Sequence, residues 1–137
     1  MFRETLAPDA RYAAALVTPA NGAFFQQRDA VAGPSRNREA PPTAAPCWLR
    51  LSRSGNEFSG SVSADGLHWT EVSRASIPMV RRTYAGLALT SHNCSVLNSA
   101  LFDNVTVLPA DGSHVVPDVA VAPCVDGVES GHDAAGN

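Results

Sequence analysis

Short runs rich in Val, Leu, Phe, Tyr and Thr alternate along the chain with clusters of Gly, Pro, Asn and Asp. This pattern is typical of strands joined by turns, and no stretch of helical period and useful length interrupts it. The sequence therefore predicts an all-β protein. The predicted strands are residues 11–18, 22–28, 47–53, 57–64, 68–72, 84–91 and 98–108, and residues 2–4 are expected to end another strand.

The alternation within these runs predicts which side chains are buried. In the run 47–53, Cys47, Leu49 and Leu51 share one face of the strand, while Trp48 and Arg50 lie on the other. In the run 57–64, the side chains of Phe58, Gly60 and Val62 alternate in the same way with polar ones. Strands of this kind belong to antiparallel sheets with one face in water. We therefore predict an antiparallel β-sandwich of two sheets.

Turn residues predict how the strands connect. Ser54-Gly55-Asn56 and Asp65-Gly66 tolerate the backbone of tight hairpins, so residues 47–72 should form a three-stranded meander. Asn21-Gly22 marks another hairpin. Residues 29–46 are long for a connection and are either a mobile loop or an irregular edge strand. In the last predicted strand, a bulge near residues 103–104 would keep all its apolar side chains inside.

Length and charge limit the class of protein. The 137 residues fit one domain, and after residue 108 the strand pattern ends, so residues 109–137 are expected to be a linker or a disordered tail. The net charge of −3 argues against binding to nucleic acid, because that affinity comes mainly from clustered cations. No window approaches the ~20 apolar residues of a membrane-spanning helix, and the first residues carry charge too early for a signal peptide.

Three cysteines, Cys47, Cys94 and Cys124, lack the spacing of a disulfide framework or of a zinc site. They are either idle thiols, or Cys47 and Cys94 form one bridge and leave Cys124 over. The sequence indicates no metal site and no cofactor.

Several blocks of residues 1–107 resemble one bacterial family. The blocks are MFRETLAPDARY, VTPANGAFFQQR, CWLRLSRSGNEFSGSVSADGLHWTEV, IPM, YAGLALTSHN and ALFDNV. Together they are similar to the concanavalin A-like domains known as "regulation of enolase"-like, a domain of largely unknown function in the lectin and glucanase superfamily. The resemblance implies a two-sheet jelly roll in a secreted, multi-domain protein. Members of that family usually carry further strands before the first block, so the chain is expected to be truncated at its N-terminus.

The best sequence-level indication of a ligand is tryptophan. Trp48 and Trp69 are the only tryptophans, and an exposed indole can stack on the apolar face of a sugar ring. Trp48 shares its predicted strand face with Arg50, so both could contact a ligand. The alternative is that Trp48 closes a second core layer or stacks on Arg50 or Arg53.

Two further groups were weighed as site residues. His92 follows a predicted strand end, where functional groups often gather, but a lone histidine is more often a hydrogen-bonded loop residue. The segment 63–69 resembles the Asp-box hairpin of sialidases with one residue missing, and a tight Asp65-Gly66 turn followed by a packed Trp69 explains it more simply.

No catalytic residues are predicted. The ExDxE pattern of glucanases is absent, and Glu57, Glu71 and Asp103 are isolated acidic residues. The preferred hypothesis is therefore a non-catalytic accessory module that binds carbohydrate or a cell-surface polymer. The alternatives are a structural or protein-interaction sandwich without a small-molecule ligand and, last, a fragment of a glycoside hydrolase. A sandwich that lacks its first strands is also expected to self-associate through an exposed sheet edge.

Overall fold

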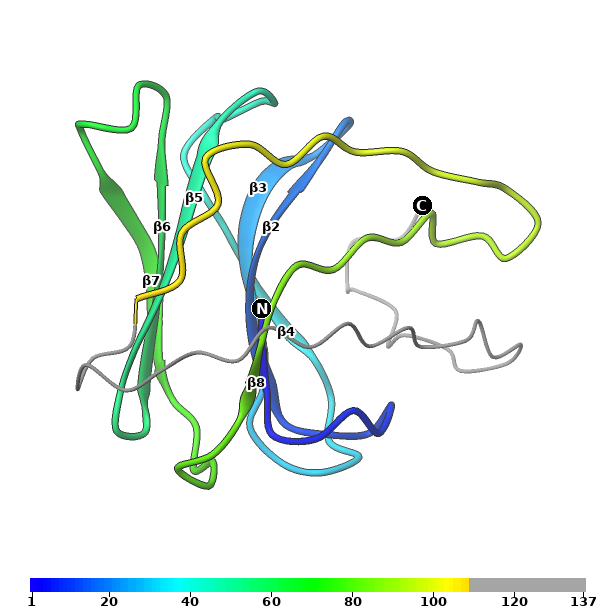
Figure 1. The fold of residues 1–137 in the computed structure, drawn as a ribbon, viewed down its shortest axis with the longest axis vertical. Helices are drawn as coiled ribbons and strands as arrows, with labels where there is room; N and C mark the ends of the chain where they lie inside the picture. Colours follow the sequence, from blue (N-terminus) through cyan, green and yellow to red (C-terminus); the bar gives the residue numbers. More distant parts are fainter. Residues whose placement is uncertain (109–137) are drawn as a thin grey trace. The chain divides into compact units, whose positions relative to one another are not determined.

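The computed structural model describes residues 1–108, which divide into two units, residues 1–86 and residues 87–108 (Figure 1). The predicted linker or tail over residues 109–137 lies outside the described residues. All strands of the described part belong to residues 1–86, and the described residues form no helix. Among them there is accordingly no helix long and apolar enough to cross a membrane. The all-β prediction is confirmed.

The first sheet has five antiparallel strands in the order β4-β3-β2-β1-β8. Its hairpin at Asn21-Gly22 joins β2 to β3, as predicted, and Thr18 pairs with Gly22. β4 falls within residues 29–46, so an edge strand, rather than a loop alone, occupies that connection. The five strands are β1 (Phe2–Arg3), β2 (Tyr12–Thr18), β3 (Gly22–Arg28), β4 (Arg36–Glu39) and β8 (Tyr84–Ala85).

The second sheet is the predicted three-stranded meander. It consists of β5 (Trp48–Ser54), β6 (Glu57–Ser63) and β7 (Thr70–Ser76) in that order. Gly55 turns the chain between β5 and β6 with a φ of +60°, which favours glycine. β7 begins two residues later than predicted, because residues 64–69 form a turn of their own. A bulge lies in β7 at Val72, where the register shifts opposite Gly60 and Ser61.

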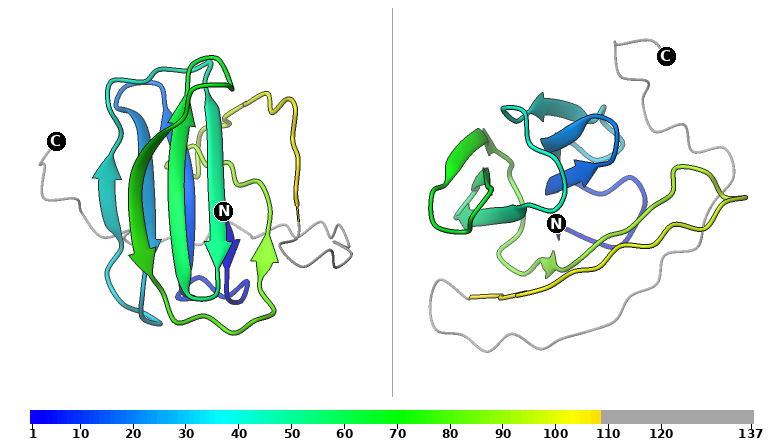
Figure 2. Two further views of the ribbon diagram at one scale, coloured as in Figure 1. Left: turned by 90° about the vertical axis from the view of Figure 1, so that its left-hand side faces the viewer. Right: turned by 90° about the horizontal axis from the view of Figure 1, so that it is seen from above.

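The core lies between the two sheets. Strands β2 and β3 contact β5, β6 and β7, and Figure 2 shows these two layers face to face. Phe58 and Val62 are buried and Leu49 and Leu51 are half-buried, so the predicted burial pattern is confirmed. Together these observations support a β-sandwich. The core cluster consists of Ala13, Phe25, Phe58, Ala75, Ile77 and Met79.

A glycine makes room for the largest ring of this core. Gly60 lies in the middle of β6, and a Cβ atom placed on it would approach Cδ2 of Phe25 to 2.5 Å. Phe25 is only 1% exposed, so its ring has little freedom to move away. The Phe25 ring of one sheet therefore packs directly against the backbone of Gly60 in the other sheet.

Two charged side chains hold the connection between β7 and β8. Arg53 donates hydrogen bonds to the carbonyl oxygens of Met79 (3.1 Å) and Val80 (2.8 Å) and to the hydroxyl of Thr83 (2.9 Å). Glu4 accepts a hydrogen bond from the Val80 amide (3.2 Å) and pairs with Arg11 (3.0 Å). The long connection is therefore fixed to both sheets by polar contacts.

The beginning and end of the strand-containing unit meet. β1 pairs with β8, so that Phe2 lies opposite Ala85. The Gly86 amide donates to the Met1 carbonyl oxygen (3.0 Å), and the Met1 amino group donates to the Gly86 carbonyl oxygen (2.9 Å). β1 is thus an inner strand of the five-stranded sheet, with neighbours on both sides.

Residues 87–108 differ from the prediction. The strand expected over residues 84–91 ends at Ala85, and the strand expected over residues 98–108, with its bulge at residues 103–104, is absent from the described chain. Leu97 and Leu101 are almost fully exposed. A strand needs a hydrogen-bonded neighbour. The alternation of apolar and polar residues shows that a segment can form a strand, but it does not show which strand it would pair with.

Candidate functional site

The structure brings three of the four predicted ligand-binding residues together at one end of the three-stranded sheet. Trp48 opens β5 and is 38% exposed, and Arg50 follows on the same face. Trp69 directly precedes β7, and the guanidinium carbon of Arg50 lies 3.7 Å from the centre of the Trp69 ring. We call Trp48, Arg50 and Trp69 the tryptophan platform.

Arg50 and Arg53 each stack on an aromatic ring. Arg50 lies over Trp69, and Arg53 lies over Phe58 at 5.2 Å from the ring centre. A guanidinium held this close over an indole gains a cation–π attraction and loses side-chain freedom. The guanidinium of Arg50 makes no hydrogen bond or ion pair with other residues in the described part of the chain. Its N–H donors are therefore available at a fixed position.

Gly66 contacts both indoles of the platform. A Cβ atom on Gly66 would lie 2.9 Å from Cε2 of Trp48, and the Gly66 carbonyl oxygen accepts a hydrogen bond from Nε1 of Trp69 (3.0 Å). Its φ of +76° also favours glycine. The Asp-Gly pair predicted the turn, but the contact with Trp48 left no signal in the sequence.

The carboxylate of Asp65 organises the turn that carries Gly66. Oδ1 accepts hydrogen bonds from the backbone amides of Leu67 and His68 (2.8 Å each), and Oδ2 lies 2.7 Å from Nδ1 of His68. Ser63, which is buried, donates its hydroxyl to Oδ1 (3.0 Å). These hydrogen bonds, the one with the His68 ring foremost, hold the pKa of Asp65 well below its usual range. Asp65 therefore has a structural role in the turn.

The fourth predicted site residue is His92. It lies in the unit of residues 87–108, with a φ of +53°, and its amide donates to Oγ1 of Thr90 (3.1 Å). Its neighbour Asn93 donates its amide to the hydroxyl of Ser91 (3.2 Å). These contacts belong to a hydrogen-bonded turn.

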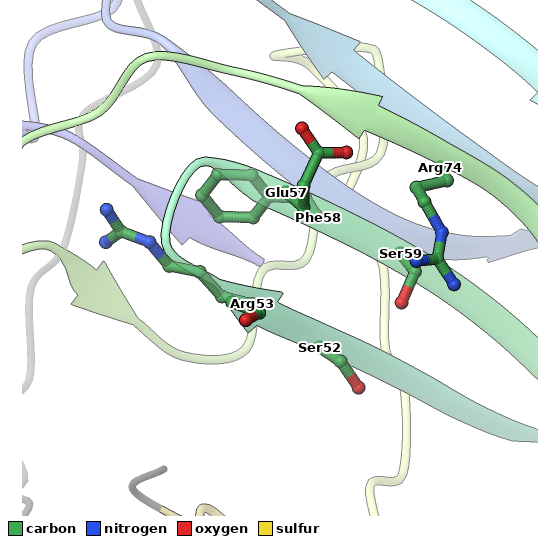
Figure 3. A pocket seen from close by; sticks show the side chains of 7 residues that line it. Ser52, Arg53, Glu57, Phe58, Ser59 and Arg74 are labelled. Atoms are coloured by element: carbon green, nitrogen blue, oxygen red, sulfur yellow. The ribbon is translucent and has the colours of Figure 1, made fainter. Parts of the chain in front are cut away.

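A small hollow lies farther along the three-stranded sheet, near the β5–β6 turn. It has a volume of about 100 Å³ and is lined by serine hydroxyls together with Arg53, Glu57, Phe58 and Arg74. Figure 3 shows the guanidinium groups of Arg53 and Arg74 pointing to opposite sides of it. Of the described residues that line the hollow, only Glu57 carries a carboxylate. The hollow therefore lacks the carboxyl pair that glycoside hydrolysis requires.

The cysteines and acidic residues do not form a metal site within residues 1–108, where no group of three potential ligands comes together. Cys47 is a free thiol, so the alternative of a Cys47–Cys94 bridge is wrong, while Cys94 is disulfide-bonded. Partial burial raises the pKa of the Cys47 thiol, which disfavours its reactive thiolate form.

Comparisons of the chain with protein-family models, with curated proteins and with solved structures found no match in any of the three. The family resemblance therefore stays a prediction.

Proposed function

We propose that this protein is a non-catalytic accessory module that binds carbohydrate through the tryptophan platform. We further propose that its two sheets form a concanavalin A-like jelly roll of the "regulation of enolase"-like kind. Domains of that family usually occur in larger, secreted proteins. A glycan or another cell-surface polymer is then the partner we expect.

The observation that carries this proposal is an exposed indole next to a guanidinium that is held by stacking and makes no hydrogen bond with another described residue. Trp48 offers an aromatic surface, and Arg50 is held beside it by stacking on Trp69. Sugars present an apolar C–H face and a rim of hydroxyl groups. An indole and a guanidinium side by side match these two parts, because the ring packs on the face and the donors reach the hydroxyl oxygens.

The surface next to the platform is polar and adds further hydrogen-bonding groups. The register places Arg50, Ser61 and Glu71 in one row across the three strands. Ser52, Ser59 and Arg74 form the next row. Neighbouring rows of the same face lie about 7 Å apart along a strand. This face could thus contact more than one sugar unit.

A glycan array probed with the wild-type chain tests the proposal. For any glycan that binds, we expect Trp48→Ala to weaken binding at least about tenfold, because it removes the stacking surface. Trp48→Phe should keep most of the affinity, since an aromatic ring remains. Arg50→Gln should weaken binding by a comparable factor, while Arg82→Gln, an exposed arginine outside the platform, serves as the charge-matched control.

Binding that persists unchanged in Trp48→Ala would contradict the stacking mechanism. Circular dichroism of each variant shows whether the sheets are intact, so that lost binding is not confused with lost folding. A wild-type chain that binds no glycan on the array would favour the second candidate function.

That second candidate is a structural or protein-interaction sandwich. It is favoured by the seven-residue strand β5, whose outer edge is unpaired in the described sheet. Unpaired strand edges are templates for another chain. Sedimentation analysis over a range of concentrations tests self-association, which predicts a mass that rises with concentration. A constant monomeric mass would contradict self-association through this edge.

A further inference from the structure

A second hollow lies between the two sheets, at the side where β4 and β7 approach each other. Its volume is about 140 Å³, and it is lined by Gln27 of β3, Arg36 and Arg38 of β4, and Ser73 and Arg74 of β7. We call it the arginine cleft. No residue of the tryptophan platform lines it, so its function can be tested separately.

The register places the two β4 arginines on the side of their sheet that faces the core. Arg38 lies opposite Phe25 and Arg36 lies opposite Gln27. Directly paired residues in an antiparallel sheet point to the same side, and Phe25 points into the core. Arg36 and Arg38 therefore occupy core-facing positions on an edge strand, where both stay exposed to solvent and line the hollow.

The opposite wall of the arginine cleft is also polar. Ser73 of β7 pairs with Gly60, which is buried against the Phe25 ring, so Ser73 belongs to the inner side of its sheet. Arg74, the next residue of this edge strand, belongs to the outer face of the sheet and also lines the hollow with a third guanidinium. Five polar residues thus surround one small space, with both hydroxyl and amide groups available beside the guanidiniums.

The charges in the arginine cleft are not balanced by its own lining. Arg36 pairs with Asp29 (2.7 Å) and Arg74 pairs with Glu71 (2.9 Å), and neither carboxylate lines the hollow. The guanidinium of Arg38 makes no hydrogen bond or ion pair with other residues among those described. Two of the three guanidiniums are thus already paired with a carboxylate, and Arg38 supplies the positive charge that remains, which favours the entry of an anion.

From this arrangement we propose that the arginine cleft binds an oxyanion group, either a free inorganic anion or the acidic group of a charged sugar. Guanidinium groups recognise carboxylate, sulfate and phosphate through paired N–H donors, and the hollow has room for several waters or for one such group. Gln27 and Ser73 would donate further hydrogen bonds to its oxygens.

Inward-pointing charges also protect edge strands from pairing with other chains, which is the competing explanation for Arg36 and Arg38. That role requires charge but no ligand. The two explanations differ in whether the wild-type chain binds an anion at the cleft.

Titration with inorganic sulfate and, separately, with glucuronate tests the proposal. Ionic strength is held constant with chloride, and millimolar concentrations avoid the general stabilisation that sulfate gives to folded proteins. We expect the backbone amide signals of Gln27, Arg38 and Ser73 to shift in nuclear magnetic resonance spectra, with a dissociation constant of about 1 mM. A larger response to glucuronate would assign the site to an acidic sugar.

Arg38→Gln should weaken this binding at least about tenfold, because it removes the guanidinium that makes no ion pair with another described residue. Arg82→Gln removes the same charge elsewhere and should leave the binding unchanged. Equal weakening in both variants would overturn the proposal, because net charge alone would then explain it. The proposal would also be overturned if sulfate and glucuronate changed the wild-type spectra no more than chloride does. This second outcome is read from the wild-type chain alone, so it does not depend on the folding of a variant.

Discussion

Replacing Gly60 with alanine tests how tightly the two sheets are packed. The added Cβ would lie 2.5 Å from Cδ2 of Phe25, which is closer than such atoms approach without a shift. Phe25 is almost fully buried, so either its ring or β6 must move. Overpacking of a core costs about 1–3 kcal/mol. Alanine is favoured over glycine in a strand by roughly 0.5–1 kcal/mol, which leaves a net destabilisation of about 1 kcal/mol at mid-range and at most about 2.5 kcal/mol.

Urea unfolding followed by tryptophan fluorescence measures this difference in free energy, because both tryptophans belong to the sheet unit. Gly86→Ala is the matched control, since no atom lies within 4 Å of its added Cβ, and we expect it within about 0.5 kcal/mol of wild type. Combining Gly60→Ala with Phe25→Leu should cost less than the sum of the two single changes. A Gly60→Ala variant more stable than wild type by roughly 0.5–1 kcal/mol, the full gain of alanine in an open strand, would refute the close packing of Phe25 on β6.

Three other changes test separate parts of the structure. Arg53→Gln should lower the free energy of unfolding by about 2–3 kcal/mol, because the guanidinium loses its hydrogen bonds to the connection between β7 and β8. A loss below about 0.5 kcal/mol in urea unfolding would show that this connection is held by other contacts. Asp65 has a lowered pKa in the folded state, so its stabilisation is complete above about pH 4, the unfolded pKa, and is lost as the pH falls further. The melting temperature of Asp65→Asn should therefore fall less between pH 5 and pH 3 than that of the wild type. Equal falls in both proteins would argue against a stabilising role of the Asp65 carboxylate. At pH 8, Cys47 should react with iodoacetamide more slowly in the folded protein than in the protein unfolded in urea, because burial raises the pKa of its thiol. Peptide mass spectrometry measures both rates, and equal rates would show that burial has no effect on this thiol.

Much of the strand-containing unit could be predicted from local pattern. Period-two alternation located β5 and β6, and turn residues such as Gly55 located the hairpins, because both signals depend on residues close in the sequence. Residues 98–108 have the same alternation but form no strand, since pairing depends on a distant partner that the pattern does not describe. β4 was ambiguous for the opposite reason, because its sequence, RNRE, has no apolar period at all.

The candidate sites were predictable only in part. Trp48 and Arg50 were expected to share a face because they alternate along one strand. The stacking of Arg50 on Trp69 depends on the turn that separates β6 from β7, and single-sequence reasoning could not place that ring. The arginine cleft combines residues of three strands from both sheets, so only the register between strands reveals it.

The mutual hydrogen bonds of Met1 and Gly86 bring the entry and exit of the sheet unit to a single point. A polypeptide that enters at residue 1 and leaves at residue 86 would not have to cross the unit. Such a unit can be inserted into a surface turn of another protein while the two ends of that turn stay close together.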